Sequence, residues 1–237
     1  INGTTGISGV DGSVSAPAVT GTDSNTGITF PSADTIKFST GGVERMAITN
    51  SGVTGISGGK ILQVANTTLN TRASLSITTQ YANNSSYIYY VTGIDTTVTT
   101  TQTNSKLLIS GSISGEFSNR EDFFGFIFSS TIGGTTAPID ALRASTDSKT
   151  NRPRYTFLPS IAYNATNNDS TPNTTQFSNY LYAPSQASGT AITIRLGVAC
   201  HTGGSETLYI NQCVNTSNNH SDYEHTTSHM TVMEVGA

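Results

Sequence analysis

The sequence has few charged residues, which make up 11% of its 237 positions, whereas about 25% is typical of soluble domains. It has two cysteines and no tryptophan, so a disulfide framework is excluded. No window approaches the roughly 18–20 apolar residues of a transmembrane helix. Only 11 Lys and Arg residues are present, and the pI of about 5.4 argues against phosphate-backbone binding. We therefore expect neither membrane insertion nor a nucleic-acid partner.

The remaining composition is polar but uncharged, and rich in Ser, Thr, Asn and Gly. Disordered chains usually combine high net charge with few aromatic residues, whereas this chain has a net charge of −4, with 10 Tyr and 9 Phe. Thr favours strands, and the scarcity of Ala, Glu, Lys and Leu argues against helices. The sequence does not begin with Met and shows no signal-like apolar stretch, so we expect a piece of a longer polypeptide. The composition predicts an all-β protein.

Residues 1–58 form the first predicted part, a slender β-rich neck. Short alternating segments, such as Ile36 to Phe38 and Met46 to Ile48, are separated by turn signals such as Asp11-Gly12 and Gly41-Gly42. The pentamer TGISG occurs at residues 5–9 and again at 54–58, which fits a repeated module. So few apolar side chains cannot offset the ordering entropy within one chain. We therefore expect the neck to bury its strands against copies of itself, with three chains around one axis as a closed solution.

Residues 59–237 form the second predicted part, a head with a jelly-roll-like β-sandwich fold. Ten strands are expected, at Lys60–Ala65, Ser74–Thr79, Tyr87–Val91, Lys106–Ser112, Phe123–Ser129, Tyr155–Leu158, Tyr180–Ala183, Ala191–Cys200, Thr207–Gln212 and His229–Val235. Residues 203–205 predict a hairpin between the eighth and ninth of these strands. The last strand is expected to be buried and central, and a short helical turn is expected at Pro138–Ala144.

A resemblance to bacteriophage tail fibres is carried by short motifs that occur in order over residues 11–55. These motifs are SAPA at residues 15–18, TGI at 26–28, ADT at 33–35, GGVER at 41–45 and NSG at 50–52. The head resembles a module at the C-termini of fibres from phages of marine bacteria and cyanobacteria. Its matching pieces are GKILQV at 59–64, SSY at 85–87, TGI at 92–94, NSKLLI at 104–109 and TVMEV at 231–235.

The resemblance implies a homotrimeric virion protein whose distal end holds the host-recognition surface. It implies a host cell-surface receptor, for which we expect a polysaccharide, and contact with other tail or baseplate proteins through a preceding N-terminal region. Two alternatives stay open. One is a purely structural virion fibre module, and the other is a bacterial surface adhesin or carbohydrate-binding module.

Two loops of the head combine aromatic rings with amides, which is the chemistry that sugar recognition uses. The candidate receptor-binding residues are Tyr81, Asn83, Asn84, Tyr87, Tyr163, Asn167, Asn168 and Asp169. Both groups also suit ordinary turns, since Asn and Tyr are abundant in this chain. A second candidate is a basic group of Arg143, Lys149, Arg152 and Arg154. It suits an anionic surface sugar or phosphate, but we favour a solvated loop or intersubunit ion pairs with Glu116, Glu121 and Asp122.

Metal and catalytic sites are not expected. His220, His225 and His229 lie close together in the sequence beside Asp222 and Glu224, but no fixed ligand spacing distinguishes them from a polar loop. Cys200 and Cys213 are expected to be thiols rather than a disulfide. No Gly-x-Ser-x-Gly elbow or Walker-type loop is present. Glu116, Glu121, Asp122 and Asp140 are the remaining acidic candidates, and we expect no enzyme and no cofactor.

Overall fold

The computed structural model describes residues 10–55, 60–79, 87–118, 124–145, 153–159, 172–200, 206–214 and 224–237. The chain forms two compact units, residues 1–60 and 61–237. In the described part of the chain, no helix is both long and apolar enough to cross a membrane.

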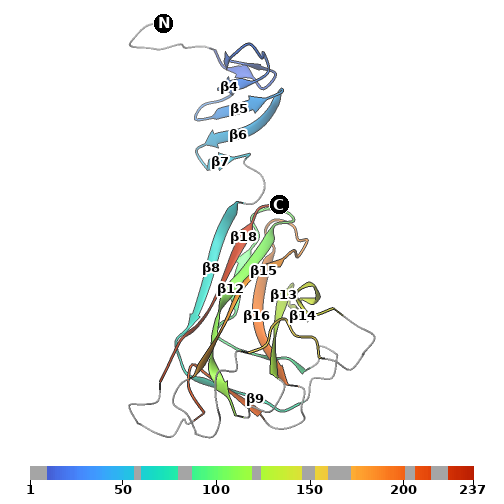
Figure 1. Ribbon diagram of the computed structural model, residues 1–237. Coiled ribbons are helices and arrows are strands. Elements are labelled where there is room, and N and C mark those ends of the chain that lie inside the picture. The colour runs from blue at the N-terminus through green and yellow to red at the C-terminus, as the bar shows by residue number, and fades with distance from the viewer. Residues whose placement is uncertain are drawn as a thin grey trace. The chain divides into compact units, whose positions relative to one another are not determined.

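The first unit is a meander of short antiparallel strands (Figure 1). Its strands are β1 (Gly12–Ser13), β2 (Ala16–Pro17), β3 (Val19–Thr20), β4 (Gly27–Thr29), β5 (Ile36–Thr40), β6 (Val43–Thr49) and β7 (Gly52–Thr54). Strands β3 to β7 pair in sequence order, and β1 and β2 form a separate pair. Tight turns make this order possible: Gly41 and Gly42, both at positive φ, join β5 to β6 in a conformation that favours glycine.

The second unit has longer strands. They are β8 (Ile61–Leu69), β9 (Ala73–Ile77), β10 (Tyr89–Tyr90), β11 (Thr96–Thr99), β12 (Lys106–Phe117), β13 (Phe124–Ile132), β14 (Thr135–Pro138), β15 (Asn173–Tyr182), β16 (Ala191–Cys200), β17 (Glu206–Ile210) and β18 (Ser228–Val235). A 3-10 turn at Asp140–Leu142 lies within the helical turn predicted at Pro138–Ala144.

These strands form two antiparallel sheets. In the larger sheet, β12 pairs with β15 along one edge and with β18 and then β17 along the other, while β8 and β9 extend the sheet outward (Figure 1). In the smaller sheet, β16 pairs with β13 on one side and with β10 and β11 on the other, and β14 pairs with β13.

Side chains from both sheets meet in one hydrophobic core. Ile194 and Leu196 of β16 and Phe128 of β13 belong to the same buried cluster as Ile109 of β12 and Val232 of β18. The alternation of strand side chains places these residues on the inward faces of the two sheets. The predicted all-β class and the β-sandwich are confirmed.

The structure bears out the prediction for the last strand. Strand β18 lies between β8 and β12, and Met230, Val232 and Glu234 are buried completely. The expected strand at Ala191–Cys200 also has the predicted bounds.

Two of the strand predictions are wrong. Strands β16 and β17 do not form a hairpin, because β16 lies in the smaller sheet and β17 pairs with β9 and β12 in the larger one. Each of the two strands buries its apolar side in the shared core. The alternation of apolar and polar residues is therefore the same whether the two strands pair in one sheet or lie in different sheets. The segment Tyr155–Leu158 forms a single bridge, Phe157 to Phe126, rather than a strand.

Candidate functional site

The sheet of the first unit has one apolar face, defined by two rows of directly opposed residues. In the first row, Val19 is opposite Ile28, Ile28 is opposite Phe38, and Phe38 is opposite Met46. Residues directly opposite each other in an antiparallel pair share a face of the sheet. The first row therefore carries four apolar side chains across four adjacent strands.

The second row lies on the same face, two residues along each strand. Ile36 is opposite Ile48, and Ile48 is opposite Val53. We call the two rows together the apolar neck face; its members are Val19, Ile28, Ile36, Phe38, Met46, Ile48 and Val53.

The apolar neck face is largely uncovered in the single chain. Val19 is 52% exposed and Val53 is 48% exposed, and in the described part of this unit the only buried residues are Pro17, Thr29, Ser39 and Ala47. A two-layer arrangement normally buries the apolar side of such a sheet. This unit therefore has almost no core of its own.

The opposite face of the same sheet is polar. Lys37 is opposite Thr29 and Ala47, and its ammonium lies 2.7 Å from the Glu44 carboxylate. Pro17 of β2 also lies on this side, because its Cβ comes within 2.8 Å of the position a side chain at Gly27 would take. The apolar side chains are therefore segregated to the face that β1 and β2 leave uncovered.

The head contains one described member of the predicted receptor-binding set, Tyr87, which is 40% exposed. The other seven, Tyr81, Asn83, Asn84, Tyr163, Asn167, Asn168 and Asp169, lie outside the described residues. The structure therefore bears on these two loops only through the described segments beside them.

Those leading segments are anchored on the same surface, the outer face of the smaller sheet. Ile88, which follows Tyr87, and Tyr155 both pack against Ile127 and Ala199. A glycine lies beneath each of them: a Cβ at position 197 would come within 2.2 Å of Ile88, and a Cβ at 125 within 2.0 Å of the Tyr155 ring. The missing side chains let both segments lie flat on the sheet.

A charged group on the same outer face was not among the predicted sites. The Arg195 guanidinium lies 4.1 Å from the centre of the Tyr90 ring and donates from Nε to Asp95 Oδ2 at 3.1 Å. Burial raises the pKa of Asp95 more than the nearby Arg195 lowers it. In the sequence, every second residue from Ile192 to Val198 is apolar, which indicates that Arg195 points away from the core. No sequence pattern indicates the partners of Arg195.

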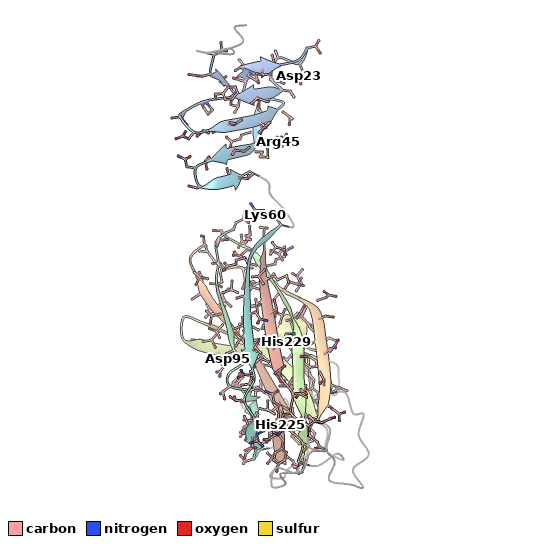
Figure 2. All side chains as sticks on the ribbon, turned by 90° about the vertical axis from the view of Figure 1, so that its left-hand side faces the viewer. Asp23, Arg45, Lys60, Asp95, His225 and His229 are labelled. Atoms are coloured by element: carbon pink, nitrogen blue, oxygen red, sulfur yellow. The ribbon has the colours of Figure 1, made fainter. Side chains whose placement is uncertain are left out.

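His225 and His229 lie apart from each other in the head (Figure 2). His225 Nε2 lies 3.4 Å from Arg72, and His229 Nδ1 lies 3.1 Å from the Ser112 hydroxyl. His220 and Asp222 lie outside the described residues. Among the described residues, no group of three or more His, Cys, Asp and Glu side chains is placed to hold a metal ion.

Two members of the basic group lie beside one acid. Arg143 pairs with Asp140, three residues before it, and Arg154 lies 4.0 Å from the same carboxylate. Glu116 accepts from the backbone N–H of Val214 at 2.6 Å. Lys149, Arg152, Glu121 and Asp122 lie outside the described residues, so the expected intersubunit pairs stay a prediction.

The two cysteines are buried thiols, as predicted. Cys200 ends β16 in the smaller sheet, and Cys213 follows β17 in the larger one.

A buried carboxylate, Glu234, ties the last strand to the loop between β11 and β12. Its Oε1 accepts from the backbone N–H of Thr101 at 2.7 Å, and its Oε2 accepts from the Thr101 hydroxyl at 2.9 Å and from Gln63 Nε2 at 2.6 Å. Burial raises the pKa of Glu234, but the hydrogen bonds, led by that from Gln63, outweigh burial and lower it.

Glu234→Gln is expected to destabilise the head by about 2–3 kcal/mol at neutral pH, because an amide nitrogen would face the Gln63 and Thr101 donors. The lowered pKa means that ionised Glu234 stabilises the fold above its ordinary pKa of 4.5, and that this stabilisation is lost as the pH falls below that value. The difference in melting temperature between the two proteins should therefore shrink from pH 7 to pH 3. Glu224→Gln, an exposed site, is the control and should not change the melting temperature; an equal difference at both pH values would contradict the prediction.

Comparison with known proteins gives no family for this chain. No protein-family model matches it, and no curated protein matches its sequence. Among solved structures, the chain is similar to one in a structure of infectious bursal disease virus Gx strain, with a TM-score of 0.31 and 13% identity over 79% of this chain and 41% of that chain. A structure of the Gt strain gives 0.32 and 12%, over 86% and 48%. The chain therefore spans less than half the length of either matched chain.

Proposed function

We propose that this chain is the distal region of a bacteriophage tail fibre, a virion protein that assembles as a homotrimer through its neck and adsorbs to host cells through its head. The observation that carries the proposal is the apolar neck face, which a single chain leaves uncovered. The fibre-like motifs in residues 11–55 support the same interpretation.

The size of the apolar neck face suits association of copies. Five strands about 4.8 Å apart, with on average about four residues each at about 3.4 Å, give a face of roughly 330 Å². Three such faces around one axis enclose about 1,000 Å², which is at the lower bound for a specific interface. Two copies stacked face to face would also cover the surface, and the resemblance to fibre repeats favours three.

The head is the part of the chain suited to receptor binding. Small side chains and glycines dominate the neck, whereas glycan sites need an aromatic platform and convergent hydrogen bonds. The segments that lead into the two Tyr- and Asn-containing loops are anchored side by side on the outer face of the smaller sheet, at Ile88 and Tyr155. This anchoring supports a shared receptor surface formed by the loops that carry Tyr81 to Tyr87 and Tyr163 to Asp169.

The test is adsorption of the fluorescently labelled chain to a panel of marine bacterial and cyanobacterial strains, measured by flow cytometry. A strain that binds should stop binding when its surface polysaccharide is removed by mutation. Binding to no strain would favour the purely structural fibre module, and binding that survives removal of the polysaccharide would contradict the glycan receptor. A bacterial adhesin would be indicated by binding to eukaryotic cells instead.

Paired substitutions then place the receptor surface. Tyr81→Ala with Tyr87→Ala, or Tyr163→Ala with Asp169→Ala, should weaken cell binding at least tenfold, while light scattering still gives the mass of the trimer. Loop substitutions of this kind usually change stability by less than about 0.5 kcal/mol, so lost binding would not reflect lost folding. Glu224→Gln is the surface control. A fragment of residues 1–58 that binds as well as the whole chain would show that the head is not the receptor-binding part.

A further inference from the structure

The outer face of the larger sheet carries an apolar row that crosses four strands. Val64 is opposite Met233, Met233 is opposite Leu108, and Leu108 is opposite Leu181. All four point away from the core, because their neighbours Val232 and Leu107 point into it. Val64 is 58% exposed and Leu181 is 48% exposed.

Toward the start of the second unit the apolar side chains continue. In the opposite direction along the strands, polar side chains take their place. Ile61, which is 49% exposed, is opposite Val235 on the same face. We call these six residues the apolar head row: Ile61, Val64, Leu108, Leu181, Met233 and Val235. The rest of this outer face is polar; its opposed residues there are Asn66, Thr68, Ser110, Ser112, Gln176, His229 and Thr231.

We propose that the apolar head row is a second interface between copies of this chain, in addition to the apolar neck face. The inference rests on the proposed function, since it requires the necks to associate. It assigns the end of the head that contains Ile61 to head–head contact, and leaves the outer face of the smaller sheet for the receptor.

Chain connectivity favours a second copy as the occupant. Six peptide steps separate Gly55, which ends the described segment 10–55, from Ile61, and they span at most about 22 Å. Association of the necks therefore keeps the Ile61 ends of all copies near one another, whatever the orientation of the heads. A short tether of this kind gives millimolar effective concentrations, at which a small apolar contact forms.

The size and charge of the row fit the same occupant. Four strands about 4.8 Å apart make the row about 15–20 Å long, and about three residues along each strand make it about 10 Å wide. The resulting area of about 200 Å² is well below the roughly 1,000 Å² of a self-sufficient interface. It would therefore hold a partner that is already tethered. The six side chains carry no charge. Lys106, which is opposite Val235 on the same face, is exposed, and its long side chain can keep the ammonium in water at the rim of the contact.

Exchange of subunits between trimers tests the inference in the full-length chain. Two preparations, labelled with a donor and an acceptor dye, are mixed, and energy transfer follows the exchange rate. Val64→Thr with Leu181→Thr places a β-branched strand former at both positions and should speed exchange at least tenfold. Asn66→Thr with Gln176→Thr changes the same two strands in the polar part of the face and should leave the rate within twofold of the unchanged chain.

The outcomes separate this inference from the proposed function. Trimers whose exchange rate is unaffected by Val64→Thr with Leu181→Thr would overturn the head interface and leave the neck interface intact. An unchanged chain that is monomeric by light scattering would overturn the proposed homotrimer itself. Circular dichroism of each variant, with an unchanged melting temperature of the head, shows that faster exchange comes from the interface and not from unfolding.

Discussion

A chain carrying Ile28→Thr and Ile48→Thr is expected to be monomeric at micromolar concentration, whereas light scattering of the unchanged chain should give three times 24.8 kDa. The two residues lie in different rows of the apolar neck face. Threonine preserves β propensity but places a hydroxyl where apolar contact is needed. The change therefore removes association without removing the strands' preference for the extended conformation.

The expected effect is large because each substitution is repeated in every copy. Ile28 is partly buried and Ile48 is 39% exposed, and the loss of their apolar contacts costs about 1 kcal/mol per side chain, so six altered side chains in a trimer weaken association by about 6 kcal/mol. Every 1.4 kcal/mol is about tenfold in an equilibrium constant, which raises the dissociation constant of the trimer by about four powers of ten. The half-assembly concentration of a trimer varies as the square root of that constant, so it rises about a hundredfold, which moves a trimer that half-assembles at roughly tens of nanomolar to several micromolar.

The matched control alters the opposite face of the same sheet. Lys37→Thr with Glu44→Thr removes an exposed ion pair, a contribution of about 0–1 kcal/mol, and should leave the mass unchanged. If the Ile28 and Ile48 variant stays trimeric, the apolar neck face is not the interface. A dimeric mass for the unchanged chain would keep the face as the interface but replace the threefold arrangement with a twofold one.

The neck was the part of the fold that local sequence described best. Ile36, Phe38, Met46, Ile48 and Val53 were expected to alternate in short strands, and they lie on one face of the sheet. Alternation within a strand and short turns between strands are both local properties, so a single sequence contains them. The direct opposition of residues on neighbouring strands depends on register, and it became known only from the structure.

The head shows where local patterns fail. Strand β11 (Thr96–Thr99) was missed because three of its four residues are threonine and only Val98 supplies an apolar signal. The connection from Cys200 to Glu206 was interpreted as a hairpin, because the sequence contains nothing to separate a turn within one sheet from a crossing between two. The pairing of β17 with β9, whose residues lie more than 120 positions apart, is set by burial in the shared core.

For the candidate sites too, residue types could be predicted from local sequence, whereas contacts between distant segments could not. The residue types of the two candidate receptor-binding loops could be read from the sequence. Adjacent apolar pairs, such as Leu107-Leu108 and Val232-Met233, break the alternation of a strand with one polar face, and they were the available signal for the apolar head row. The contacts of Arg195 with Asp95 and Tyr90 join distant segments, and no local pattern indicates them.

Deletion of residues 229–237 is expected to make the protein insoluble. It removes all but the first residue of β18, which pairs with β8 on one side and with β12 on the other. Both neighbours would then present unpaired N–H and C=O groups along edges that are buried in the intact sheet. Exposed strand edges of that length pair with other chains and aggregate.

The energetic loss exceeds what a domain of this size can absorb. Met230 and Val232 are completely buried, and removing each costs about 2–5 kcal/mol. The hydrogen bonds that Glu234 accepts from Gln63 and Thr101 are lost as well, at about 1.5–3 kcal/mol for a charged group. Together these losses match the total stability of about 5–15 kcal/mol for a typical domain.

A chain that ends at Val235 is the control, because it lacks Gly236 and Ala237 but keeps all of β18. It should remain in the supernatant after centrifugation of the lysate and give the trimer mass by light scattering, since the hydrogen bond from the Ala237 backbone N–H to Gln102 that it loses is an exposed one. A soluble, trimeric and cell-binding product of the longer deletion would show that β18 is dispensable, because the core and its flanking strand edges would then be stable without the strand that joins them.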